Sequence, residues 1–110
     1  MIDWTRVKDL QDEIGPDDFA EVVELFLEET DEVVGRLRSS PPLTEIESLL
    51  HFLKGSAVNL GLATLAQLCA DGERRAAGGQ PQEVDLAAVA TAYARSKDEF
   101  LTGLEKRRAA

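Results

Sequence analysis

A single histidine, His51, is accompanied at helical spacing by a lysine and a glycine. Lys54 follows it by three residues and Gly55 by four, and residues at these spacings are neighbours on the surface of an α-helix. An imidazole, an ammonium group and a position without a side chain would therefore share one patch. A small anion could be held there on the imidazole, because Lys54 can offset its charge and Gly55 leaves room for it.

The phase of the expected helix places this patch on its outer side. Apolar residues repeat at three- and four-residue intervals from Ile46 through Leu53 to Leu60. An advance of about 100° per residue puts His51 nearly opposite Leu53 and Leu60, which excludes a core position. Exposure alone does not show that His51 has a function, so an ordinary surface histidine is the alternative. The remaining residues on the face of His51 or at its border are Thr44, Glu47, Ser48, Phe52 and Val58.

The motif His51-x-Leu53-Lys54-Gly55, with Ser56 and then Asn59-Leu60-Gly61 after it, resembles the signature of histidine-containing phosphotransfer (HPt) domains. The likeness continues through Leu65, Leu68, Cys69 and Glu73, although Gly72 stands where the family often has a leucine. The resemblance covers nearly the whole chain. It implies that His51 is phosphorylated on a ring nitrogen and exchanges the phosphoryl group with an aspartate of a response-regulator receiver domain, or takes it from a histidine kinase.

Helical patterns account for most of the chain, and no segment shows the alternation expected of strands. We expect a short helix with Trp4 at its start that ends near Ile14, and further helices over about residues 18–38, 44–60, 62–77 and 84–107. Asp18 with Glu21 and Thr44 with Glu47 have the spacing of capping boxes at two of the starts. These elements predict an all-α fold, an up-down-up-down antiparallel four-helix bundle with a short extra N-terminal helix.

The turn at Gly61 suggests a partner for His51. Antiparallel pairing of the helices on either side would put His51 level with residues 71–73. Glu73 could then hold the second imidazole nitrogen, and an ordinary surface carboxylate is the alternative. Phe52, at the border of the core, is either a core-edge residue or an apolar contact for a partner.

Composition limits the classes of function. The 110 residues are expected to form one domain, 1–110, and a net charge of −9 makes nucleic acid an improbable partner. The chain contains neither a run of 18 apolar residues nor a signal-peptide pattern, and a single cysteine suits a reducing compartment. We therefore expect a cytoplasmic monomer without membrane contact.

No motif for binding a nucleotide is present, and one histidine with one cysteine makes no zinc site. We expect a phosphotransfer protein without autonomous kinase activity and without a metal or other cofactor, any Mg²⁺ belonging to the receiver. Two alternatives remain: a helical adaptor that binds a kinase or receiver without carrying phosphate, and a module of a larger kinase. His51, Lys54 and Gly55 together favour the carrier over the adaptor.

Overall fold

The structure, a computed structural model, describes residues 2–109, and within this range the chain is all-helical and has no β-strand. The predicted all-α class is confirmed. The α-helices are α1 (Trp4–Ile14), α2 (Pro16–Arg38), α3 (Leu43–Leu60), α4 (Ala63–Ala77) and α5 (Leu86–Ala109), and a short 3₁₀ helix, η1 (Pro81–Glu83), precedes α5.

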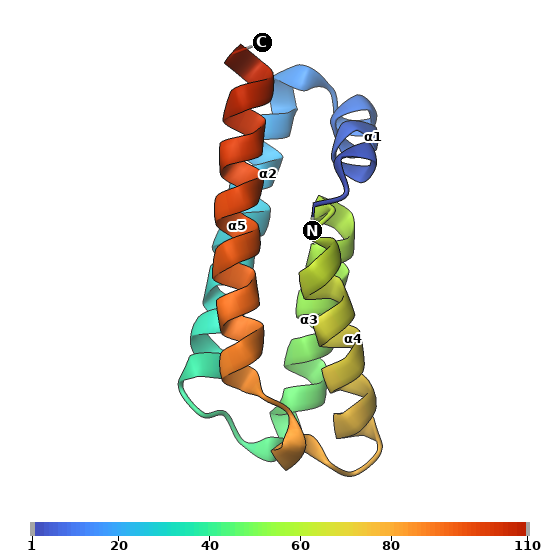
Figure 1. The fold of residues 1–110 in the computed structure, drawn as a ribbon, viewed down its shortest axis with the longest axis vertical. Coiled ribbons are helices and arrows are strands. Elements are labelled where there is room, and N and C mark those ends of the chain that lie inside the picture. Colours follow the sequence, from blue (N-terminus) through green and yellow to red (C-terminus); the bar gives the residue numbers. More distant parts are fainter. Residues whose placement is uncertain (1, 110) are drawn as a thin grey trace.

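The four longer helices run along the long axis of an elongated molecule that measures 46 × 21 × 20 Å (Figure 1). α2 lies beside α5, α3 lies beside α4, and the chain reverses its direction at each connection between them. α1 packs against α2 and α3 at the end where α3 turns into α4.

Leucines of α3 and α4 form the centre of the core. Leu50, Leu53, Leu60 and Leu65 have no exposed surface, and Phe100 of α5 is equally buried. Burying such a side chain contributes about 1.5–3 kcal/mol each, so these residues fix which side of α3 faces inward. The opposite side of α3, which carries His51, is thereby turned to solvent.

Both predicted capping boxes are wrong. α2 begins at Pro16, before Asp18, because proline suits the first turn of a helix and Gly15 precedes it at φ +97°. α3 begins at Leu43, and its N-cap is Pro42, whose carbonyl accepts the amide N–H of Glu45. Neither helix start has a side-chain cap, so Thr44 and Glu47 are free to face solvent.

Two helices start directly after an aspartate that caps them. Asp3 accepts the amide N–H of Arg6 at 3.2 Å, and Asp85 accepts that of Ala88 at 2.9 Å. The predicted start of α1 at Trp4 is confirmed, and Ile2 before it forms an isolated β-bridge with Leu62. α5 starts after the predicted Val84, because the side chain of Asp85 satisfies an amide group at the helix start.

A stacked arrangement of side chains fastens α1 to α5. The ring of Trp4 lies parallel to that of Phe100, with centroids 6.1 Å apart, and the Arg107 guanidinium lies 3.8 Å from the centre of the Trp4 ring. Gly103 makes this possible, because a Cβ there would come within 2.2 Å of the indole.

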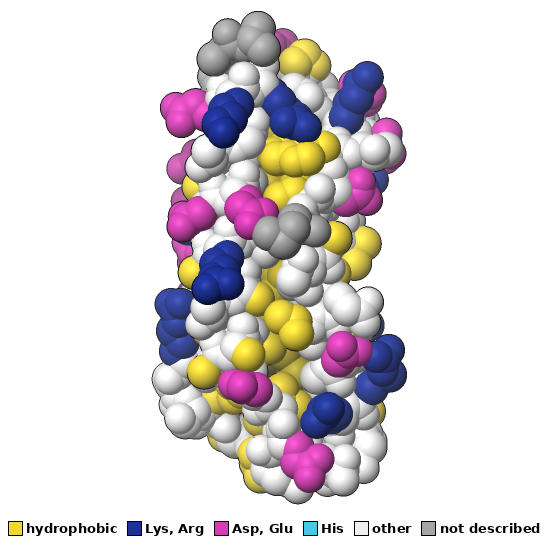
Figure 2. Space-filling view, viewed as in Figure 1, with side chains coloured by type: hydrophobic (Ala, Val, Ile, Leu, Met, Phe, Trp, Pro, Cys, Tyr) yellow, Lys and Arg dark blue, Asp and Glu magenta, His cyan; other side chains and the backbone are white. Residues whose placement is uncertain are grey.

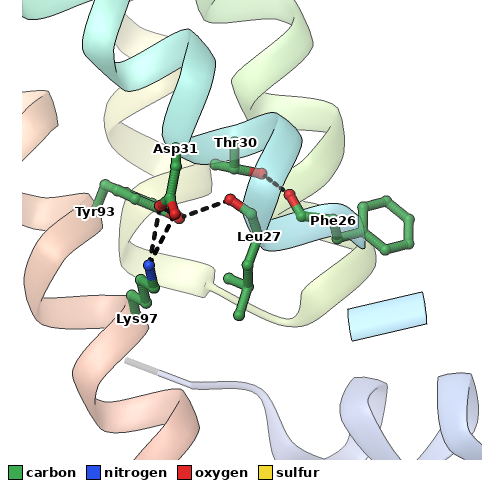
Figure 3. A network of polar contacts seen from close by, with 6 residues as sticks. All are labelled: Phe26, Leu27, Thr30, Asp31, Tyr93 and Lys97. Atoms are coloured by element: carbon green, nitrogen blue, oxygen red, sulfur yellow. Dashed lines mark hydrogen bonds and ion pairs between the residues drawn. The ribbon is translucent and has the colours of Figure 1, made fainter. Parts of the chain in front are cut away.

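A polar network joins α2 to α5 (Figure 3). The buried Tyr93 hydroxyl donates to the Asp31 carboxylate, and Lys97 Nζ lies 3.0 Å from both oxygens of that carboxylate. Burial by itself would raise the pKa of Asp31, but the hydrogen bonds from Tyr93 and Lys97 outweigh it and lower the pKa. Burial and the Asp31 contact raise the pKa of Tyr93.

Candidate functional site

The imidazole of His51 projects from the middle of α3, and 70% of its side chain is exposed. Its neighbours Leu50 and Leu53 are fully buried, and these two anchors set the rotation of the helix. His51 is therefore held at the surface by the packing of residues beside it in the sequence.

Glu73 of α4 lies next to the imidazole. Its Oε2 is 2.8 Å from His51 Nδ1, so the two side chains join adjacent helices. The register is set by the left-handed turn at Gly61 (φ +78°), which leads α3 directly into α4. Gly72 lets α4 approach closely, because a Cβ there would stand only 2.9 Å from Leu50 Cδ1.

Lys54 completes a three-residue cluster. Its Nζ lies 2.6 Å from Oε1 of Glu73, so each carboxylate oxygen has its own partner. The hydrogen bond from Lys54, followed by that from His51, lowers the pKa of Glu73, so the carboxylate is ionised at neutral pH. An ionised carboxylate only accepts hydrogen bonds, so the bonded His51 nitrogen, Nδ1, carries the proton. In the neutral imidazole, Nε2 then has the free lone pair.

Gly55 lies on the exposed side of α3, one turn beyond His51. A Cβ built at this position would have no other atom within 4 Å, beyond its own helix backbone and its chain neighbours. Packing therefore does not require a glycine here. The other residues predicted on this face are exposed as well: Thr44, Glu47, Ser48, Phe52 and Val58.

The sequence did not reveal the ion pair between Lys54 and Glu73. Lys54 was expected beside the phosphate, and in the structure its ammonium group contacts a carboxylate 19 positions along the chain. One expectation from the sequence could have revealed this ion pair, namely that residues 71–73 lie beside His51. Lys54 is a neighbour of His51 on the same face of α3, so it can reach Glu73 as well. Periodicity within α3 alone contains no information about this contact.

Cys69 lies one helical turn before Glu73 and is fully buried. Burial, with a smaller effect of the Glu73 charge, raises the pKa of its thiol to about 12. The thiol therefore belongs to the core and takes no part in the chemistry of the cluster.

Metal sites and membrane-spanning helices are absent from the described residues. Among residues 2–109, no group of His, Cys, Asp and Glu side chains is arranged to hold a metal ion. None of the described helices combines the length and apolarity needed to cross a membrane.

Comparison with known proteins adds to this geometry. The sequence model of the Hpt domain family matches residues 21–99, a range that includes His51, Lys54, Gly55 and Glu73. Phosphorelay protein LuxU of Vibrio harveyi is 28% identical over 86 residues, which cover 76% of this chain and 75% of that protein. No solved structure gives a significant match.

Proposed function

Because the chain belongs to the Hpt domain family, we propose that it is a phosphorelay carrier that accepts a phosphoryl group on His51. It exchanges this group with an aspartate of a response-regulator receiver domain, or takes it from a histidine kinase. The observation that carries the proposal is an exposed imidazole whose Nδ1 is bound to Glu73, because this leaves Nε2 available to attack. The similarity to a phosphorelay protein supports it.

The transfer is a substitution at phosphorus. The lone pair of His51 Nε2 attacks the aspartyl phosphate of the receiver while the P–O bond to the aspartate breaks. A P–N bond forms, and the electron pair of the broken bond leaves with the aspartate as a carboxylate. The proton on Nδ1 stays on the ring, which becomes positively charged, and Glu73 at 2.8 Å stabilises that charge. Return of the phosphoryl group follows the same path in reverse.

Lys54 and Gly55 serve the incoming phosphoryl group in this proposal. A lysine ammonium has three N–H donors, and Glu73 needs only one of them at Oε1. The others can meet phosphoryl oxygens after a small rotation of the flexible side chain. The open space over Gly55 gives the phosphoryl group and the docking receiver room.

The receiver docks, in this proposal, on the exposed side of α3 around His51. Phe52 and Val58 are 41% and 55% exposed and offer apolar contacts, while Thr44, Glu47 and Ser48 offer polar ones. We further propose that residues 1–110 act as one monomeric domain, an antiparallel four-helix bundle of α2–α5 with α1 as the extra helix. The reversals of the chain between α2 and α5 support this arrangement (Figure 1).

The test uses the receivers of the organism that encodes this chain, each phosphorylated on its aspartate with radiolabelled phosphate. We expect acid-labile label to pass to the purified protein, and ³¹P NMR to report a phosphoramidate. His51→Gln should abolish labelling and leave the melting temperature nearly unchanged, because the side chain is exposed. Acid-labile label on the His51→Gln protein would contradict the assignment.

A further inference from the structure

A groove of about 1060 Å³ runs between α1 and α5, with α2 as its floor. It follows α2 from Pro16 to Asp31, a length of roughly 22 Å at the helical rise of ~1.5 Å per residue. Figure 2 shows hydrophobic side chains between α5 and α1 on one face of the molecule. The groove is long enough for about four turns of another helix.

Apolar side chains from all three helices line the groove. Leu101 of α5 is 41% exposed, and Leu104 beside it is half-buried. Ala20 and Val23 contribute from α2, and Trp4 from α1. The stack of Trp4 with Phe100 and Arg107 holds α1 against α5 at one end, so the walls are fixed by packing.

The charges around the groove are not balanced. Asp31 is paired with Lys97, and Arg107 lies over Trp4. Glu24 and Glu28, one turn apart on the α2 edge, form no ion pair with any other described residue. On the α1 edge Lys8 is accompanied by Asp9. The lining contains four acidic and three basic side chains. Two of the acidic ones, Glu24 and Glu28, make the α2 edge an acidic rim beside an apolar floor, on a chain of net charge −9.

We propose that this groove binds a basic amphipathic helix of a partner protein. The apolar face of that helix would cover Ala20, Leu101 and Leu104, and its lysines or arginines along one flank would meet Glu24 and Glu28. A helix laid into an apolar groove uses residues at helical spacing as anchors. Opposite charges at the rim speed association and select the partner.

The groove is separate from the phosphotransfer site. None of the residues that line it belongs to α3 or α4, the helices that carry His51, Lys54 and Glu73. A partner bound in the groove would leave His51 open to a receiver. Such a tether raises the effective concentration of the bound partner at the carrier without contributing to the chemistry.

The experiment uses three synthetic helical peptides of about 16 residues, the length that spans the groove. One is basic and amphipathic, with leucines at i, i+3, i+4 and i+7 and arginines on one flank. The second replaces each arginine by glutamate, and the third scrambles the basic sequence so that no apolar face forms. Trp4, the single tryptophan of the chain, lines the groove and reports binding through its fluorescence. Only the basic amphipathic peptide should give a saturable change.

Matched variants locate the binding. Leu101→Ser should weaken binding roughly tenfold, whereas Leu25→Ser should not, because Leu25 is even more exposed, on α2, but lies outside the groove. Glu24→Lys with Glu28→Lys should weaken binding of the basic peptide and allow the acidic peptide to bind. Glu29→Lys with Glu32→Lys changes the net charge by the same amount outside the groove and should leave the preference unchanged. His51→Gln should bind the peptide like the wild type.

Several outcomes would overturn the proposal. A scrambled peptide that binds as well as the amphipathic one would show attraction by charge alone. Equal effects of the groove pair and the control pair of charge reversals would place binding elsewhere. A protein that dimerises in sedimentation and is made monomeric by Leu101→Ser would identify a second copy as the occupant. No saturable response to the basic peptide would mean that the groove binds no such helix.

Discussion

Glu73 contacts both His51 and Lys54. Replacing it therefore tests whether it positions the imidazole for transfer without being needed for folding. Glu73→Gln should slow transfer between the receiver and His51 roughly tenfold to a hundredfold, the range expected when a hydrogen bond to a charged group is lost. The melting temperature should fall slightly, because glutamine keeps the size of the side chain but removes the charge that Lys54 is paired with.

A readout other than rate tests the positioning role. In ¹⁵N NMR spectra of the imidazole, wild type should show the proton on Nδ1, and Glu73→Gln should show a mixture of tautomers. If the variant keeps the wild-type tautomer and rate, Glu73 does not act on His51.

Gly55 allows stability and function to be separated at a single position. Gly55→Ala should raise the free energy of unfolding by about 0.5–1 kcal/mol, because Gly55 is inside α3 and a Cβ meets open space. Gly55→Gln should keep most of that gain. Transfer should fall from Gly to Ala to Gln, since a longer side chain obstructs the phosphoryl group and the receiver. Chemical denaturation and transfer rates measure the two effects.

Two other glycines are the controls for this series. Gly61→Ala should destabilise the protein, because the position has φ +78° and a Cβ would meet the carbonyl oxygen of Asp3 at 2.6 Å. Gly72→Ala should destabilise it through contact with Leu50. A lower melting temperature for Gly55→Gln would show that Gly55 has a packing role.

At the scale of the elements, the sequence predicts what lies along one helix better than what lies between helices. The spacing of Leu53 and Leu60 predicts the exposure of His51, because a 3.6-residue period is a local property. Glu73 lies beside His51 because the turn at Gly61 between α3 and α4 is short. The charge network of Asp31, Tyr93 and Lys97 joins residues more than 60 positions apart, and no local pattern contains it.

Helix starts were harder to predict for a different reason. Thr44 with Glu47 has the composition of a capping box, yet Pro42 already begins α3 with its carbonyl. Competing start signals within a few residues are decided by backbone geometry, for which the sequence gives only weak preferences.

The network between α2 and α5 should make stability depend on pH. The pKa of Asp31 is lowered from 3.8 in the folded protein, so the stabilisation it provides is present above that value and is lost as the pH falls below it. Tyr93→Phe removes a buried donor to this carboxylate and should cost about 1 kcal/mol at neutral pH. The difference between the two proteins should shrink as the pH falls below 3.8 in urea titrations. A difference that is constant down to pH 2 would show that the hydroxyl contributes only through packing.

At the scale of the whole molecule, net charge opposes the compact state. The chain carries 21 acidic and 12 basic residues, and Glu21, Glu24, Glu28, Glu29 and Glu32 are all exposed on α2. Self-repulsion of this kind is screened when salt shortens the Debye length to about 8 Å at physiological ionic strength. We therefore expect the melting temperature to rise between low salt and physiological salt.

Neutralising charges outside the groove tests this explanation. Glu29→Gln with Glu32→Gln should raise the melting temperature at low salt and reduce its dependence on salt. A melting temperature that falls with added salt would mean that the ion pairs of Asp31 and Glu73 outweigh the repulsion.

Cys69 makes the lifetime of the His51 cluster measurable. Its thiol has no exposed surface, and a pKa near 12 leaves almost no thiolate at neutral pH, so an alkylating reagent has neither access nor a nucleophile while α4 is in place. Glu73 is on the same helix one turn away, so an opening of α4 that exposes the sulfur also takes the carboxylate from His51. The alkylation rate of the native chain therefore counts those openings of α4 in which the imidazole loses its partner, and no label has to be introduced.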